Sequence, residues 1–286
     1  MRRTPTVRTL LEESIRRLES APLAYGHGTL NALDEGAWLV LHALGLPVHE
    51  LEPHLDESVS PARAAQALAL IQRRIRTKKP AAYLIHEAWL GPHRFYVDER
   101  VIVPRSFIAE LLRNWGKRPV PGSVLDLCTG SGCLAILAAL AFPKATVDAA
   151  DLSAEALAVA DRNVTDYQLA NRVHLVRSNM FGALAGKTYD LIVSNPPYVK
   201  AASMRKLPAE YRAEPSLALA SGTDGLDHTR TILREAKRHL NPGGRLVVEI
   251  GHNRKALEKA YPPLPFRWPK TSGGALYVFE LRYQDL

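Results

Sequence analysis

Cysteine is scarce in this 286-residue chain, and long apolar runs are missing. The two cysteines, Cys128 and Cys133, lie in one short segment, with no further cysteine to complete a zinc site or a disulfide framework. No apolar run approaches the roughly 20 residues that a membrane-spanning helix needs. The sequence therefore favours a reduced, cytoplasmic setting, and neither a metal site nor a membrane partner is expected.

A targeting signal is also missing at the start of the sequence. Residues 1–5 are basic, but no apolar core follows them, and Glu12 and Glu13 come soon after. A secretory signal needs an apolar core of at least seven or so residues. We therefore expect an untargeted protein.

Acidic residues are outnumbered, with a formal charge of +8 and a pI near 9.5. This excess favours an acidic partner such as RNA or a ribonucleoprotein, although many soluble proteins are mildly basic. Five cations gather at the end of one predicted helix: Arg73, Arg74, Arg76, Lys78 and Lys79. Cations stabilise a helix C-terminus, but five exceed that need, so they form a candidate contact for rRNA phosphates.

Residues 1–79 are interpreted as a small helical domain for substrate recognition. Thr4-Pro5 predicts the N-cap and first turn of a helix that ends at Ala21-Pro22. A second helix is predicted over 30–44 and a third from Ser60-Pro61 to about Arg76. Four positions of the second helix are expected to face inward: Leu33, Ala37, Leu41 and Leu44.

Residues 80–104 are interpreted as a β-hairpin linker around the turn at Gly91-Pro92. Its expected strands are 82–85, 88–90, 95–97 and 101–103. A helix is predicted from Phe107 to Trp115. Arg105 lies just before this helix, and two roles stay open for it. It either forms a structural ion pair or binds a carboxylate or carbonyl near a site.

From residue 105 to 286, predicted strands alternate with predicted helices. The first strand is expected to begin at Ser123 and to lead into a glycine-rich turn, and the others are expected at 145–151, 173–176, 189–193, 245–250 and 275–281. This alternation predicts an α/β fold with a doubly wound, Rossmann-like parallel sheet. Ligands of such sheets bind at the carboxyl ends of the strands.

A glycine-rich turn follows the first of these strands. Gly130, Gly132 and Ala135 fit the dinucleotide pattern, and Asp151 ends the next strand, which leaves NAD open as a ligand. However, the carboxylate of Asp126 opposes a pyrophosphate and suits a ligand with an ammonium group. S-adenosylmethionine has such a group, carries no phosphate, and offers ribose hydroxyls to Asp151.

The end of the third strand offers contacts for an adenine ring. Asn179 can accept a hydrogen bond from the exocyclic amine, and Met180 can cover the ring. The complete set of candidate cofactor-binding residues is Asp126, Cys128, Thr129, Gly130, Ser131, Gly132, Asp151, Leu152, Asn179, Met180 and Asn195.

The fourth strand ends in Asn195-Pro196-Pro197-Tyr198. The prolines exclude a helix and hold the residues before them extended. The Asn195 side-chain oxygen and the Pro196 carbonyl can therefore accept the two hydrogens of a flat NH2 group, and Tyr198 can lie over its face. The simpler interpretation is a rigid stop between strand and loop.

Four segments, 103–106, 126–133, 195–198 and 214–226, together resemble the class I S-adenosylmethionine-dependent methyltransferases. The resemblance covers essentially the whole chain. It is strongest to the PrmB-type protein-glutamine methyltransferases of the HemK/PrmC-like superfamily, which modify large-subunit ribosomal protein 3. It implies methyl transfer from S-adenosylmethionine to a glutamine N5, with S-adenosylhomocysteine as product.

The resemblance also implies roles for single residues. Asn195, Pro196 and Tyr198 would be catalytic. The substrate would contact Asn195, Pro196, Pro197, Tyr198, Arg105 and Glu214. The protein partner would be ribosomal protein 3, free or in an assembling particle. In this fold the end of the third strand often carries an acid, whereas this chain has Asn179 there.

Other functions share parts of this pattern. Release-factor glutamine methyltransferases usually read Pro-Arg-Pro-x-Thr-Glu where this chain has Pro-Arg-Ser-Phe-Ile-Ala at 104–109. Adenine-N6 methyltransferases of RNA or DNA share Asn-Pro-Pro-Tyr. A non-catalytic assembly factor and an NAD oxidoreductase are further alternatives. We expect a thermal-shift comparison of S-adenosylmethionine with NAD to separate the last of these.

Overall fold

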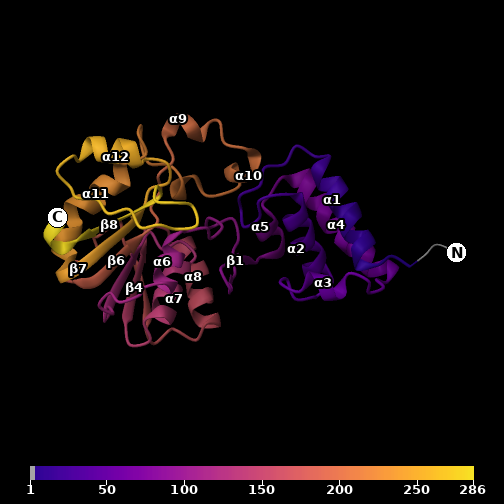
Figure 1. The fold of residues 1–286 in the computed structure, drawn as a ribbon, viewed down its shortest axis with the longest axis horizontal. Coiled ribbons are helices and arrows are strands. Elements are labelled where there is room, and N and C mark those ends of the chain that lie inside the picture. Colours follow the sequence, from indigo (N-terminus) through magenta and orange to yellow (C-terminus); the bar gives the residue numbers. More distant parts are fainter. Residues whose placement is uncertain (1–3) are drawn as a thin grey trace. The chain divides into compact units, whose positions relative to one another are not determined.

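The computed structural model describes residues 4–286 and divides them into two compact units (Figure 1). The helical unit runs to Ala88 and also includes Leu207–Ala213. The sheet unit comprises Trp89–Lys206 and Glu214–Leu286. The chain therefore passes between the units three times, and the last two passages enclose the short segment Leu207–Ala213.

The helical unit is built from short helices around a small apolar core. They are α1 (Val7–Glu19), α2 (Ala32–Ala43), α3 (Leu51–His54), α4 (Pro61–Thr77), α5 (Ala81–Ile85) and α10 (Ala209–Arg212). Val7, Val40 and Ala67 are buried together where α1, α2 and α4 meet. Asn31 and Ser60 cap α2 and α4 through their side chains, as polar N-caps do.

Two details of this unit differ from the sequence-based expectation. The cap of α1 is Thr6, not Thr4, because Thr6 and Thr9 form a reciprocal capping box. Leu33 was expected to face inward, but it is 52% exposed. It lies in the first turn of α2, before the stretch Trp38–Leu41 that fills the core.

The connector is less strand-like than predicted. Residues 82–85 lie in the buried helix α5, because Pro80 starts that helix and His86, at φ 53°, ends it. The hairpin consists of β1 (Ala88–Leu90) and β2 (His93–Phe95) alone. Residues 101–103 form no strand, since the Val103 amide donates to the Glu214 carboxylate (2.9 Å) rather than to a neighbouring strand.

The sheet unit contains a six-stranded sheet in the order β5-β4-β3-β6-β7-β8. The strands are β3 (Ser123–Leu127), β4 (Thr146–Asp151), β5 (Val173–Arg177), β6 (Tyr189–Ser194), β7 (Leu240–Glu249) and β8 (Val278–Arg282). Neighbours from β5 to β7 are parallel, and only β8 runs antiparallel. The predicted α/β Rossmann-like fold is confirmed, with an antiparallel edge strand added.

Helices cover both faces of this sheet, as Figure 1 shows. One apolar cluster joins α6 (Ile108–Arg113), α7 (Cys133–Ala141) and α8 (Ala154–Asp166) to one face. The other face packs against α11 (Asp227–Glu235) and α12 (Arg254–Ala260). Alternate strand residues divide between the clusters: Val124 joins the first, and Leu125 the second.

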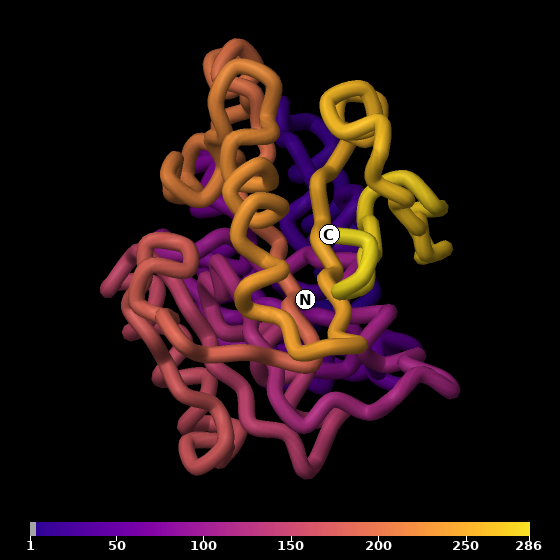
Figure 2. The backbone as a smooth tube through the Cα atoms, turned by 90° about the vertical axis from the view of Figure 1, so that its left-hand side faces the viewer, coloured from indigo at the N-terminus to yellow at the C-terminus, as the bar shows by residue number. Residues whose placement is uncertain are grey.

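The remaining elements are single turns. They are α9 (Ala201–Met204) and the 3-10 turns η1 (Ser216–Ala218), η2 (Ala236–His239) and η3 (Tyr283–Asp285). Figure 2 follows the chain through orange α11 and into β7 and yellow β8. Within residues 4–286, no helix combines the length and apolar character needed to cross a membrane.

Candidate functional site

The carboxyl ends of four neighbouring parallel strands meet at one edge of the sheet. The ends are Leu127 of β3, Asp151 of β4, Arg177 of β5 and Ser194 of β6. The four loops that follow them therefore gather at this edge, where a doubly wound sheet binds its ligands. Three of these loops hold the predicted glycine turn, the adenine contacts and the Asn-Pro-Pro-Tyr motif.

A cavity of about 440 Å³ lies at this edge of the sheet unit. Eight of the predicted site residues line it: Cys128, Gly130, Asp151, Leu152, Asn179, Met180, Asn195 and Pro197. Their sequence positions span almost seventy residues, so the fold brings together what the strand-end argument predicted.

Both glycines of the turn have positive φ, a backbone region that glycine adopts without steric cost. Gly130 and Gly132 have φ of 56° and 79°. A Cβ on Gly132 would lie 3.1 Å from the Ala160 Cβ, whereas the space around Gly130 is open. Gly132 thus permits close packing against α8, and Gly130 leaves room for a ligand to approach the backbone.

Asp126 is buried beneath this turn and organises it. Its Oδ2 accepts hydrogen bonds from Thr129 Oγ1 (2.5 Å) and from the Ala135 amide (3.0 Å). Its Oδ1 is buried and has no partner in the described part of the chain. Burial raises the pKa of Asp126 to about 7. Asp126 does not line the cavity, so its contact with a ligand ammonium stays a prediction.

Asp151 lines the cavity beside the turn. Its Oδ2 accepts from the Gly130 amide and its Oδ1 from the Ser153 amide, both at 2.9 Å. Burial raises the pKa of this carboxyl, although both amides favour its charged form. Each oxygen keeps a lone pair for another donor. The carboxylate is therefore fixed and can accept from a diol.

Apolar and sulfur-bearing side chains form part of the cavity wall. Leu152 is 45% exposed although it is apolar. The Met180 sulfur lies 4.0 Å from the Cys128 sulfur. Burial raises the pKa of the Cys128 thiol, so the thiol is neutral and serves as wall rather than nucleophile. Such a surface suits an aromatic ring, with Asn179 at its edge.

Asn195 carries the most informative unsatisfied atom of the cavity. Its Oδ1 is buried and has no hydrogen-bond partner among residues 4–286. The preceding Ser194 is locked by a hydrogen bond from its Oγ to the Leu127 carbonyl (2.7 Å). A buried polar atom without a partner costs free energy, which a ligand that donates to it would recover. Asn195 is therefore a ready-made acceptor.

Tyr198 is held in place by close backbone packing. A Cβ on Gly251 would lie 2.7 Å from the Tyr198 ring, and a Cβ on Gly225 would lie 2.5 Å from its carbonyl oxygen. Asn253 Nδ2 donates to the same carbonyl (2.9 Å). Pro196 and Tyr198 do not line the cavity. Their contact with a substrate therefore stays a prediction.

Comparison with known proteins identifies the family. Residues 107–210 match the methyltransferase small domain. The ribosomal protein uL3 glutamine methyltransferase of Neisseria meningitidis serogroup B is 54% identical, over 98% of this chain and 94% of the relative. Its counterpart in Burkholderia pseudomallei is 52% identical, over 98% and 95%. The chain belongs to the ribosomal protein uL3 glutamine methyltransferase family.

The family resemblance predicted from the sequence is thereby confirmed. A solved structure of a methyltransferase from Pyrococcus furiosus superposes with a TM-score of 0.51, at 20% identity, over 74% of this chain and 97% of that chain. This likeness supports the class I methyltransferase fold of the family member described here.

Arg105 and Glu214 were predicted to contact the substrate, but they bind each other. Arg105 Nη1 and Nη2 donate to the two Glu214 carboxylate oxygens at 2.5 and 2.6 Å. The Glu214 side chain is fully buried, and neither residue lines the cavity. The neighbouring Ser106 Oγ donates to the buried Glu249 (2.7 Å). Two roles had been left open for Arg105, and the geometry favours the structural ion pair.

Two stretches of the cavity wall were missed from the sequence. They are 99–102 before α6 and 215–218 around η1. Arg100 is fixed by Asp98, whose carboxylate accepts from Arg100 Nε (2.9 Å) and Nη2 (2.6 Å). This guanidinium lowers the pKa of Asp98 to about 2. A sequence signal existed for the second stretch only, because 215–218 lies within the segment 214–226 that carried the family resemblance.

His228 also lines the cavity and was not predicted. Its Nδ1 lies 2.9 Å from Ser221 Oγ, and burial lowers the pKa of its imidazole. The ring is therefore neutral near pH 7. Across the described residues, no group of three or more histidine, cysteine or acidic side chains is placed to hold a metal ion.

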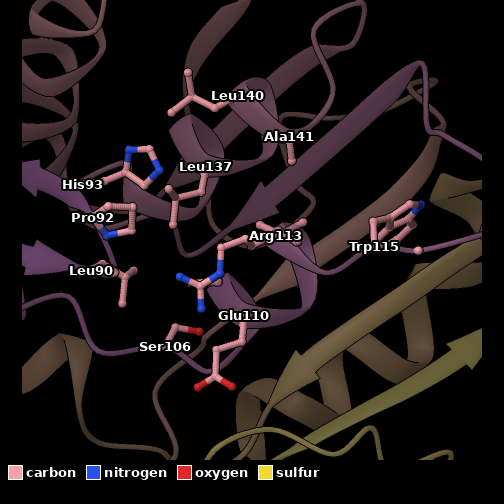
Figure 3. A pocket seen from close by; sticks show the side chains of 14 residues that line it. Leu90, Pro92, His93, Ser106, Glu110, Arg113, Trp115, Leu137, Leu140 and Ala141 are labelled. Atoms are coloured by element: carbon pink, nitrogen blue, oxygen red, sulfur yellow. The ribbon is translucent and has the colours of Figure 1, made fainter.

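A second cavity of about 600 Å³ lies elsewhere in the sheet unit (Figure 3). Arg113 of α6 points into it between Leu90 and Glu110, and Leu137 of α7 also lines it. None of the predicted catalytic or cofactor-binding residues lines it. It is therefore separate from the site at the strand ends.

One of the five cations predicted to contact phosphate at the end of α4 is not accessible. Arg74 is fully buried, and its Nε donates to Glu35 (2.7 Å). Its charge is compensated by acids inside the helical unit, as a buried guanidinium requires, so it is not available to bind phosphate. Arg73, Arg76, Lys78 and Lys79 stay the candidates for such a contact.

Proposed function

We propose that this protein transfers a methyl group from S-adenosylmethionine to the side-chain amide nitrogen of a glutamine in ribosomal protein uL3. Full-length similarity to enzymes named for this reaction supports the substrate. The observation that carries the chemistry is the buried, unpartnered Asn195 Oδ1 at the cavity. An amide NH2 is the donor that fits this acceptor.

The cavity residues fit S-adenosylmethionine as the methyl donor. Asp151 can accept from the ribose hydroxyls, and the wall of Leu152 and Met180 suits the adenine. The open space over Gly130 and the unpartnered Asp126 Oδ1 suit the amino-acid end of the donor. When bound, S-adenosylmethionine supplies a sulfonium methyl group that is already activated for transfer.

The work left for the protein is alignment of a poor nucleophile. The lone pair of an amide nitrogen is delocalised into its carbonyl. Asn195 Oδ1 and the Pro196 carbonyl can accept its two hydrogens and so fix the plane of the amide. The same oxygens stabilise the positive charge that develops on nitrogen during attack. Alignment of this kind supplies at most about 7–11 kcal/mol.

No general base is required from the side chains of the site. The proton becomes acidic once nitrogen carries the methyl group, so it can leave to water after transfer. His228 is neutral and is already joined to Ser221. We therefore assign it no proton-transfer step.

Ribosomal protein uL3 is the proposed partner, free or in an assembling particle. A ribosomal-protein substrate implies a cytoplasmic enzyme. We further propose that Arg73, Arg76, Lys78 and Lys79 contact rRNA in such a particle. Replacing these four by glutamate should weaken binding to the particle and flatten its salt dependence. Unchanged binding would show that they are only a solvated helix end.

The reaction is tested by incubating the enzyme with methyl-labelled S-adenosylmethionine and purified uL3, release factor or rRNA in parallel. We expect label in uL3 alone, and mass spectrometry should locate it on a glutamine. Label in release factor would identify the other glutamine branch, and label in RNA an adenine methyltransferase. Mass spectrometry of ribosomal proteins from cells with and without the enzyme gives the matching test in vivo.

A further inference from the structure

Residues 200–218 form one loop, here termed the strap loop, whose base lies next to the Asn-Pro-Pro-Tyr motif. The base is closed by two hydrogen bonds, from the Val199 amide to the Leu219 carbonyl (2.8 Å) and from the Ser221 amide to the Val199 carbonyl (2.9 Å). The middle of the strap loop, Leu207–Ala213, belongs to the helical unit. Both of its ends belong to the sheet unit.

The middle of the strap loop is fastened inside the helical unit by Glu210. Arg74 Nη1 donates to Glu210 Oε1 (3.2 Å), and the Ala24 amide donates to the same oxygen (3.0 Å). Arg74 Nε binds Glu35 Oε1 at 2.7 Å. Arg74, Glu35 and Glu210 are each no more than 1% exposed. Loss of either acid would leave the buried guanidinium poorly compensated.

Ring packing adds to this fastening. The rings of Tyr211 and His27 lie with their centroids 4.3 Å apart. The Tyr211 hydroxyl also lies close over Gly26, where a Cβ would come within 2.6 Å of it. Two consecutive residues of the strap loop are thus packed into the helical unit, which is more than a passing surface contact.

The two ends of the strap loop adjoin the proposed site in different ways, one after the Asn-Pro-Pro-Tyr motif and the other at the cavity wall. Its first residue, Lys200, comes two residues after Tyr198. Its last residues, 215–218, form part of the cavity wall, and Leu217 there is 53% exposed. The helical unit therefore holds the middle of a loop whose ends flank the reacting groups.

We infer that Glu210 is a positioning residue, which, with Arg74, fixes the strap loop so that Tyr198 and the cavity wall at 215–218 keep the geometry needed for methyl transfer. This inference rests on the proposed function. It assigns the helical unit a role in turnover in addition to substrate recognition. Glu210 itself touches no reacting atom in this scheme.

Two matched variants test the inference, Glu210→Ala and Glu35→Ala. Each removes one of the two carboxylates from the same buried guanidinium, but only Glu210 belongs to the strap loop. Hydrogen exchange of the full-length proteins is measured by mass spectrometry over 199–206 and 214–221. Steady-state turnover of uL3 and S-adenosylmethionine affinity by calorimetry are measured in parallel.

Glu210→Ala should speed exchange in both stretches and lower kcat/KM for uL3 by about tenfold, a typical coupling between sites. Glu35→Ala should speed exchange in α2 and α4 but leave both stretches and kcat/KM near the wild-type values. Glu210→Gln keeps the acceptor oxygen and should restore most of the loss. Equal effects of the two alanine variants on the strap loop, or no effect of either, would overturn the inference.

The exchange measurement separates this inference from the proposed function. If the wild-type enzyme does not methylate uL3, the proposed function fails, but exchange over 199–206 and 214–221 still reports whether Glu210 fixes the loop. If the wild type methylates uL3 and Glu210→Ala changes neither exchange nor turnover, the inferred role of Glu210 is wrong, whereas the proposed function stands.

Discussion

Asn195, Arg105 and Glu214 were all named from the sequence as substrate contacts, although a structural ion pair stayed open for Arg105. The structure separates them by what their polar atoms already bind. The Asn195 Oδ1 is buried beside the cavity without a partner. Both Glu214 oxygens accept from Arg105, and one of them also accepts from Val103.

This difference indicates which residues bind ligands and which maintain the scaffold. A buried charge that is paired with an opposite charge holds the scaffold together, so removing one partner is strongly destabilising. An unsatisfied buried polar group costs folding free energy and is available for binding. The two regions should therefore respond oppositely to mutation, one in stability and the other in turnover.

The largest effect is expected for Glu214→Ala. It leaves the half-buried Arg105 and the Val103 amide without their carboxylate, so the free energy of unfolding should fall by about 3 kcal/mol. Urea denaturation measures this loss. The double variant Arg105→Met/Glu214→Met should recover part of it. A stable Glu214→Ala that has lost turnover would instead place Glu214 in contact with the substrate.

Asn195→Ala should show the opposite pattern. Turnover of uL3 should fall on the order of a hundredfold, since one oriented acceptor is removed from the developing charge. Binding of S-adenosylmethionine should change far less than turnover, because Asn195 is one of several cavity residues that would contact it, and the free energy of unfolding should be nearly unchanged. Calorimetry and urea denaturation provide these two controls, and the exposed Asn171→Ala serves as a matched variant. Near-normal turnover would exclude the proposed mechanism.

Asp151→Ala should act on the methyl donor instead. The carboxylate lines the cavity and is oriented by two backbone amides. A hydrogen bond to a charged group is worth about 1.5–3 kcal/mol, so affinity for S-adenosylmethionine should drop roughly tenfold or more. Calorimetry measures it directly. Asp151→Asn, which keeps one acceptor oxygen, should lose less, and unchanged affinity in both would remove Asp151 from the ribose contact.

Much of the sheet unit was predictable because its signals are local. The buried strand residues 191–193 form an apolar run, and Gly130 and Gly132 mark a turn with positive φ. Residues 82–85 were misread as a strand, because four apolar residues do not distinguish a short buried helix from a strand. The preceding Pro80 was the one available hint.

Pairings between distant residues were not predictable. Glu210 lies 136 residues from Arg74, and Glu214 lies 109 residues from Arg105. No periodicity links such positions, so a basic helix end looked uniformly exposed although Arg74 is buried. The same limit explains why 99–102 and 215–218 were missed as cavity walls, since only the folded sheet brings them to its carboxyl edge.

Asp126 combines both behaviours and gives the smallest, sharpest test. Its Oδ2 is saturated, but its Oδ1 is not, and its pKa is raised from 3.8 to about 7 by burial. Because the carboxyl pKa is raised in the folded state, the folded protein keeps this proton up to a higher pH than the unfolded chain does. The contribution of Asp126 to stability should therefore fall as pH rises from about 4 to about 7, and Asp126→Asn should remove that dependence.

The same carboxyl should report on the methyl donor. If the donor's ammonium approaches Asp126, it lowers the pKa again, and binding near pH 7 should release about half a proton from this group. Calorimetry in buffers of different ionisation enthalpy measures the release. Asp126→Asn should abolish this share, whereas Asp151→Asn should not. Equal proton release in wild type and Asp126→Asn would show that Asp126 does not contact the donor. Asp126 would then only hold the glycine turn, as a residue of the scaffold.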